Sequence, residues 1–140
     1  MSKLWVGFLL AHRIYLKNNR EISGMYYRRY AGQLDYIPAT DGYYEVETFI
    51  IQDESIGFAM TEVVPGSNAG WRISGRASKQ GSEYVANNVK FANSGATSLD
   101  RTISFTVFEE EPGVLASIHG QIYGLDIPTC HFEGDLEVIK

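Results

Sequence analysis

Apolar and polar residues alternate almost without error in four segments of the C-terminal half of the chain. Residues 71–77 place apolar or small residues at the odd positions and Arg72, Ser74 and Arg76 at the even ones. Residues 102–107, 116–122 and 131–138 follow the same rule. This two-residue period is typical of half-buried β-strands, because an α-helix would scatter the apolar positions around its circumference.

A turn signal joins the middle two of these segments. In Glu111-Pro112-Gly113-Val114 the proline presets φ at the second turn position and the glycine accepts a positive φ at the third, as in a type II turn. Placing Glu111 opposite Val114 makes three pairs of apolar or glycine residues: Val107 with Ile118, Phe105 with Gly120, and Ile103 with Ile122. A slip of one residue would break all three pairs, so the register is predicted together with the hairpin.

A second hairpin is predicted between residues 25–37 and 43–51. The segment between them, Pro38-Ala39-Thr40-Asp41-Gly42, ends in the turn dipeptide Asp-Gly. Folding about Thr40 sets Tyr36 opposite Tyr44, and continues with Gly32 opposite Thr48 and Tyr30 opposite Ile50 on the apolar face.

The remaining segments give weaker signals. Residues 4–17 also alternate, but their second face is partly apolar, so we expect a strand and leave a buried helix open. Residues 57–64 predict a strand, and residues 83–92 predict a strand with a bulge at Asn87-Asn88. The polar stretches 17–24 and 93–100 are expected to be loops.

These elements predict an all-β fold with a single antiparallel domain over residues 1–140. Short connections favour a meander of about eight or nine strands, whose edges must be covered or paired. We expect an up-and-down β-barrel and keep a two-sheet β-sandwich as the alternative. A barrel of this size either fills its interior with side chains or holds one small ligand.

The predicted shape resembles the calycins, the group of lipocalin and avidin-like barrels, in architecture alone. Lipocalins carry Gly-x-Trp near the start of their first strand, whereas this chain has Trp5-Val6-Gly7 in the reverse order. No functional residue is therefore carried over from that group.

Composition excludes several classes of protein. An apolar fraction of 44% with an aromatic fraction of 13% is too high for a disordered chain. Twelve Lys and Arg against 17 Asp and Glu argue against a nonspecific nucleic-acid surface. No apolar run has the length that spans a bilayer as a helix, so no membrane partner is expected. The single cysteine, Cys130, fits a reducing compartment such as the cytoplasm, with secretion as the alternative.

The most informative anomaly is Arg28, which has the same parity as the predicted inward tyrosines of its strand. An unpaired buried charge is costly, so an inward arginine indicates either a ligand site or a side chain that reaches solvent at a strand end. His12 has an inward parity on its own segment, and a hairpin near Arg20 would bring it close to Arg28 or Tyr30. The predicted site combines an anion anchor with orienting hydroxyl groups. Its residues are Arg28, Tyr26, Tyr30, His12, Tyr36 and Tyr44.

Signatures of catalysis, metal binding and cofactor binding are missing from the sequence. The three histidines lack metal-ligand spacing, and no phosphate-binding loop or nucleophile elbow occurs. The run Glu109-Glu110-Glu111 at a tight turn is expected to face water. We therefore expect neither a metal nor a cofactor, and an enzyme is the least favoured of three hypotheses.

Two other hypotheses remain. The first is a barrel that binds a small, partly apolar and anionic ligand, and the second is a structural or interaction protein that acts through its surface or as a homo-oligomer. The volume of the interior distinguishes them, because a packed interior favours the interaction protein and a hollow one favours the binder.

Overall fold

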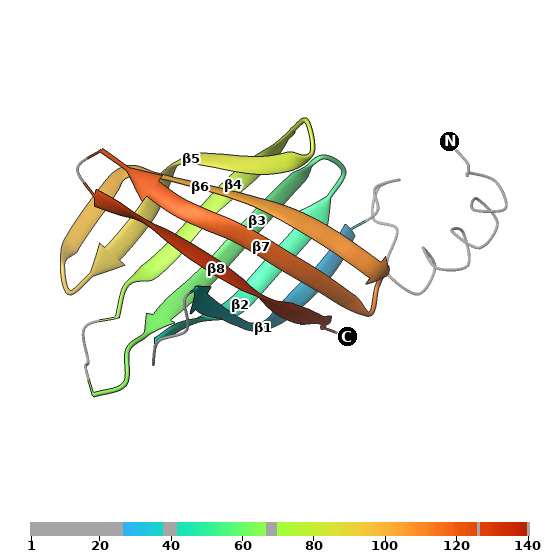
Figure 1. Ribbon diagram of the computed structural model, residues 1–140, viewed down its shortest axis with the longest axis horizontal. Coiled ribbons are helices and arrows are strands. Elements are labelled where there is room, and N and C mark those ends of the chain that lie inside the picture. The colour runs from blue at the N-terminus through green and yellow to red at the C-terminus, as the bar shows by residue number, and fades with distance from the viewer. Residues whose placement is uncertain (1–26, 38–41, 67–69, 126, 140) are drawn as a thin grey trace, which may run out of the picture.

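The computed structural model describes residues 27–37, 42–66, 70–125 and 127–139. Eight antiparallel strands in chain order close into one barrel (Figure 1). The strands are β1 (Tyr27–Ile37), β2 (Tyr43–Gln52), β3 (Ser55–Val63), β4 (Arg72–Gln80), β5 (Glu83–Asn93), β6 (Ala96–Glu111), β7 (Leu115–Gly124) and β8 (Ile127–Val138). Because β8 pairs back onto β1, every one of these strands has two neighbours. The predicted all-β meander barrel is confirmed, and the two-sheet sandwich is wrong.

The meander gives the barrel two distinct ends. At the first end β1 begins and β8 finishes, and the turns from β2 to β3, β4 to β5 and β6 to β7 lie there. At the second end β1 finishes and β8 begins, and the hairpin of β5 and β6 reaches past its neighbours (Figure 1). The predictions for residues 4–17 and 17–24 lie outside the described residues.

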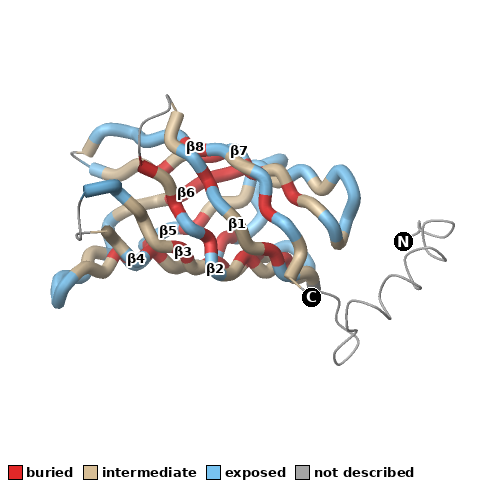
Figure 2. The backbone as a smooth tube through the Cα atoms, turned by 90° about the horizontal axis from the view of Figure 1, so that it is seen from below, coloured by how far each residue is buried: buried red, intermediate tan, exposed pale blue. Residues whose placement is uncertain are grey.

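The middle of the barrel is filled with apolar side chains. Buried positions alternate with more exposed ones along the strands, and all eight strands contribute to the core (Figure 2). The space left between nine of these side chains, which include Phe49, Phe105 and Phe132, is about 10 Å³. A cavity of that size holds at most one water, whereas ligand pockets measure hundreds of Å³.

The three predicted core pairs of the hairpin of β6 and β7 are confirmed, whereas a register shift after Phe108 pairs Glu111 with Leu115 and not with Val114. Val107 lies opposite Ile118, Phe105 opposite Gly120, and Ile103 opposite Ile122. The turn closes with a hydrogen bond of 3.0 Å from the amide of Val114 to the carbonyl of Glu111. Gly113 takes the expected positive φ, at 83°.

The predicted pairing of β1 and β2 is wrong by two residues at its start. Tyr44 lies opposite Leu34, not Tyr36. An irregularity in the pairing between Val46 and Thr48 then changes the parity of β2. As a result Phe49 and Ile51 are buried where Thr48 and Ile50 were expected to point inward. A bulge depends on how both neighbouring strands pair, so the alternation within β2 alone does not reveal it.

Residues 93–100 are not the expected loop. β5 continues to Asn93 and β6 starts at Ala96, so only Ser94 and Gly95 form the turn. Both take positive φ, 46° and 90°, as tight hairpin turns with the native strand twist require. The bulge predicted at Asn87-Asn88 is confirmed, since Asn88 has φ 54° and the pairing shifts between Ala86 and Val89.

Within the described part of the chain, no helix is long and apolar enough to cross a membrane.

We expect Gly120→Ala to destabilise the barrel strongly. A Cβ at Gly120 would lie 2.5 Å from the carbonyl oxygen of Ser104 and 2.6 Å from the Cβ of Phe105, so backbone must shift to admit it. Overpacking of this kind costs about 3 kcal/mol of the free energy of unfolding, measurable by urea denaturation. Gly57→Ala is the matched control, since the nearest atom to its Cβ is the flexible end of Arg76 at 3.7 Å. Equal stability of the two variants would contradict this packing.

Candidate functional site

The structure divides the predicted site residues between the two ends of the barrel. Arg28 and Tyr30 lie at the first end, whereas Tyr36 and Tyr44 lie at the second. The eight residues from Arg28 to Tyr36 correspond to roughly 26 Å of strand, so one small ligand cannot contact both groups. Tyr26 and His12 lie outside the described residues.

At the first end Arg28 is paired with an acid from β6. Its Nε and Nη2 donate to the two carboxylate oxygens of Glu109, and the Tyr30 hydroxyl donates to the same carboxylate. The Gly113 amide in turn donates to the Tyr30 hydroxyl, at 2.9 Å. The side chains of Arg28 and Glu109 are only 14% and 16% exposed. Glu109 therefore occupies the position that an anionic ligand would take, and it does not face water as expected.

This network accounts for the acid–base behaviour of Tyr30. Burial raises the pKa of its hydroxyl well above the usual value, and the hydrogen bond to Glu109 and the charge of Glu109 raise it further. The pKa of Tyr84 is raised in the same way, by burial first and by the charge of Glu109 second. The first end is thus a compensated charge cluster that closes the barrel.

At the second end Tyr36 and Tyr44 lie edge to face, with ring centroids 5.0 Å apart. Gly42 makes room for this arrangement, because a Cβ there would lie 2.4 Å from the Tyr36 ring. The Tyr36 hydroxyl donates to Oε2 of Glu62, which lies on β3 directly opposite Tyr44. Glu62 extends the inward row of Phe58 and Met60 to the rim of the barrel.

Arg101 reaches the same end from β6. Its guanidinium carbon lies 4.5 Å from the ring centroid of Phe91 and 5.8 Å from that of Trp71. Within the described residues it makes no hydrogen bond and no ion pair, although it is partly buried. In contrast to Arg28, this inward guanidinium lies over aromatic rings and forms no ion pair with a described acid.

The pKa of the Tyr44 hydroxyl is affected by several of these groups. Burial raises it above its usual value, and the charges of Cys130 and Glu62 raise it further, whereas the charge of Arg101 opposes the shift. β2 and β6 are four strands apart in the closed order of eight, so Tyr44 and Arg101 face each other across the barrel. The second end thus brings together a cation, a carboxylate, two phenol groups and two further aromatic rings.

The sequence contained a signal for the residues that the site prediction missed. Arg101 and Glu109 have the same parity as Ile103, Phe105 and Val107 on the predicted strand. The polar stretch 93–100 predicts a loop, which places Arg101 at a strand end and hides its inward parity. Two further acids and a turn follow Glu109, so the run as a whole predicts a solvated turn.

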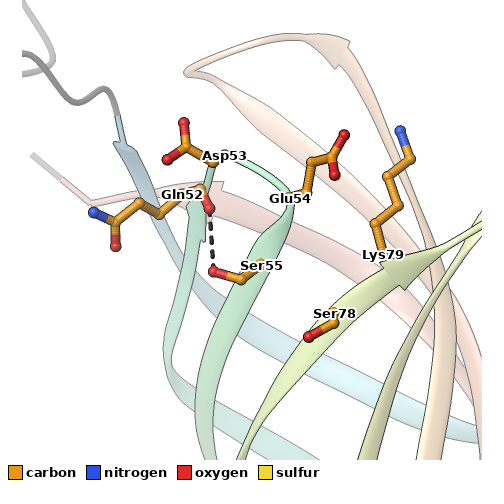
Figure 3. Close-up of a pocket in the computed structure, with 6 residues that line it drawn as sticks. All are labelled: Gln52, Asp53, Glu54, Ser55, Ser78 and Lys79. Carbon is orange, nitrogen blue, oxygen red and sulfur yellow. Dashed lines mark hydrogen bonds between the residues drawn. The ribbon is translucent and has the colours of Figure 1, made fainter.

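A third feature, an open depression of about 450 Å³ at the rim of the first end, has no arrangement suited to a ligand. It lies between the turn at Asp53-Glu54 and the last residues of β4 (Figure 3). Gln52 and Asp53 extend to one side and Lys79 to the other, and no ion pair joins Lys79 to a described acid (Figure 3). The polar groups therefore do not converge.

Comparison with known proteins gives no relative. No family model, no curated protein and no solved structure matches the chain. The resemblance to calycins consequently rests on barrel architecture alone, and any function must be argued from the site itself.

We expect Arg28→Met to destabilise the protein by about 3 kcal/mol, because it leaves the Glu109 carboxylate largely buried without its cation. The double variant with Glu109→Gln should recover part of this loss, since both charges are then absent. Urea denaturation of the single and double variants measures the difference. A single variant within about half a kcal/mol of the wild type would show that the pair is effectively solvated.

We also expect stability to fall at alkaline pH. Burial keeps Tyr30, Tyr36 and Tyr44 protonated in the folded state, so their pKa values exceed the unfolded value. The free energy of unfolding is then unaffected by these groups below a pH of about 10. It decreases as the pH rises above that value, because only the unfolded chain releases these protons. Denaturation at increasing pH measures the slope, and Tyr44→Phe should make it shallower. An unchanged slope in that variant would contradict the assignment.

Proposed function

We propose that this protein binds a small, partly apolar ligand through an anionic group at the second end of the barrel. The observation that carries the proposal is the state of Arg101, an inward, partly buried guanidinium that lies over Phe91 and Trp71 and makes no hydrogen bond or ion pair with a described side chain.

Arginine at such a position suits the recognition of a carboxylate or phosphate. Its planar fork offers five N–H donors and binds two oxygens at once, and weak hydration lets it stack on aromatic rings. The rings of Phe91 and Trp71 hold the guanidinium in place, which lowers the entropy lost when a ligand binds. Trp71, which is only partly buried, also offers apolar surface to the body of the ligand.

The filled middle of the barrel limits the ligand to the end. Because the space between the core side chains is about 10 Å³, the ligand would lie over the core and not within it. By the criterion of interior volume this packing favours the interaction protein, so the binding proposal rests on the rim of the second end alone.

The same packed interior supports a second candidate function, that of an interaction protein. In that case the barrel is a rigid scaffold, and the large apolar side chains exposed at its surface, such as Phe108 at 62% and Leu125 at 82%, would contact a partner chain or a second copy.

A ligand screen with a matched pair of variants tests the first proposal. We expect 4-methylbenzoate, a flat aromatic carboxylate, to bind the wild type and to lose about tenfold or more in affinity for Arg101→Met, since a charge-assisted hydrogen bond is removed. Met retains much of the packing of the stem, so the melting temperature should change little. Isothermal titration calorimetry measures the affinity.

The control is Arg72→Met, which removes an exposed arginine of the outer surface that pairs with Glu47 at 3.1 Å. It should leave binding unchanged. Binding that survives Arg101→Met, or that is lost equally in both variants, would overturn the proposed site. A wild type that binds no carboxylate and self-associates would favour the interaction protein.

A further inference from the structure

We propose that the ligand of the second end is bipolar, with a carboxylate that pairs with Arg101 and, across an apolar body, an ammonium group that pairs with Glu62. This inference rests on the proposed function and names the chemical class of the ligand.

The first support is the position of the two charges. Glu62 lies on β3 and Arg101 on β6, three strands apart in a closed order of eight, so they project from different walls of the same end. They form no ion pair with each other. Glu62 lies directly opposite Tyr44, its backbone amide donates to the carbonyl of Trp71, and the Arg101 guanidinium lies over the Trp71 ring. Two opposite charges held apart at the mouth of a barrel match a ligand whose own charges are separated.

The second support is the unused acceptor capacity of Glu62. Oε2 accepts the hydrogen bond from the Tyr36 hydroxyl, whereas Oε1 accepts none from the described residues. An ionised carboxylate offers about four lone-pair sites, so one donor leaves Glu62 able to accept more. The bond from Tyr36 fixes the orientation of the carboxylate and leaves Oε1 for an ammonium group.

The third support is the aromatic lining between the two charges. Trp71 packs against the core and is only partly buried. Its backbone carbonyl accepts from the amide of Glu62, and the Arg101 guanidinium lies over its ring. A flat ring fits such a surface through stacked or edge-to-face contacts. Aromatic faces also favour a neighbouring cation, which applies to a ligand ammonium as it does to Arg101.

The same arrangement disfavours ligands of a single charge. A plain carboxylate gains from Arg101 but is repelled by Glu62, and a plain amine has the opposite difficulty. A ligand with a single charge also removes water from the opposite charge of the site without replacing it, which weakens binding further. Proteins commonly discriminate between ligands in this way, by leaving a charge unpaired or repelled when the wrong ligand binds.

Three probes of the same size test the inference. 4-(Aminomethyl)benzoate carries an ammonium and a carboxylate on opposite sides of one ring, 4-methylbenzoate carries the carboxylate alone, and 4-methylbenzylamine carries the ammonium alone. We expect the bipolar probe to bind the wild type about tenfold or more tightly than either of the others at neutral pH and low salt, where charge pairing is least screened.

Two variants then separate the contributions. Glu62→Gln keeps an oxygen acceptor for Tyr36 while it removes the charge, so it should weaken the bipolar probe by about tenfold and leave 4-methylbenzoate unchanged or tighter. Arg101→Met should weaken both of these probes. Their melting temperatures should stay near that of the wild type, which confirms that each variant folds.

The outcomes distinguish the two proposals. If 4-methylbenzoate binds as tightly as the bipolar probe and Glu62→Gln changes neither, the bipolar ligand is overturned and the anion site remains. If Arg101→Met changes no affinity, the proposed function itself is overturned. Failure of the bipolar probe to bind the wild type at millimolar concentration also overturns the inference.

Discussion

Closure of the sheet between β1 and β8 is the constraint on which the rest of the structure depends. Tyr30 pairs with Val138 and Tyr36 with Phe132, so the first and last strands meet along most of their length. A closed barrel of eight strands has an interior that side chains can fill, and here they do, leaving about 10 Å³ between them. The inward row of each strand is therefore apolar in the middle, and polar groups are confined to its two ends.

Each end receives an inward arginine, and the two are compensated in different ways. Arg28 meets Glu109 across the first end, and the pair is reinforced by Tyr30 and by the Gly113 amide of the neighbouring turn. Arg101 at the second end meets aromatic rings, while the nearby Glu62 is engaged by Tyr36 instead. The Arg28 guanidinium is thus paired with an acid of the chain itself, whereas the donors of Arg101 have no partner among the described residues. The binding proposal rests on this contrast between the two ends.

Irregularities in the strand pairing lie close to Arg101 on β6 and to Tyr44 on β2. In the ladder between β5 and β6, Phe91 pairs with Ser98 while Val89 pairs with Arg101, so β6 has an extra residue just before Arg101. Such bulges change the direction in which the following side chains point. On β2 the irregularity after Val46 allows Tyr44 at the second end and Phe49 in the middle to face inward together. The contents of the two ends thus depend on where the regular alternation is interrupted.

The sequence by itself determined the all-β meander, the register of β6 and β7, and the inward side of most strands. These features are local, because alternation within one segment and a Pro-Gly turn between two segments suffice to specify them. It also identified Arg28 as an inward charge. Only the tertiary structure decided that Arg28 meets Glu109, 81 residues away, and that Arg101 has no such ion pair within the described part of the chain. Pairing across a barrel depends on closure and on bulges, which shift register over a whole ladder, and no single segment encodes either.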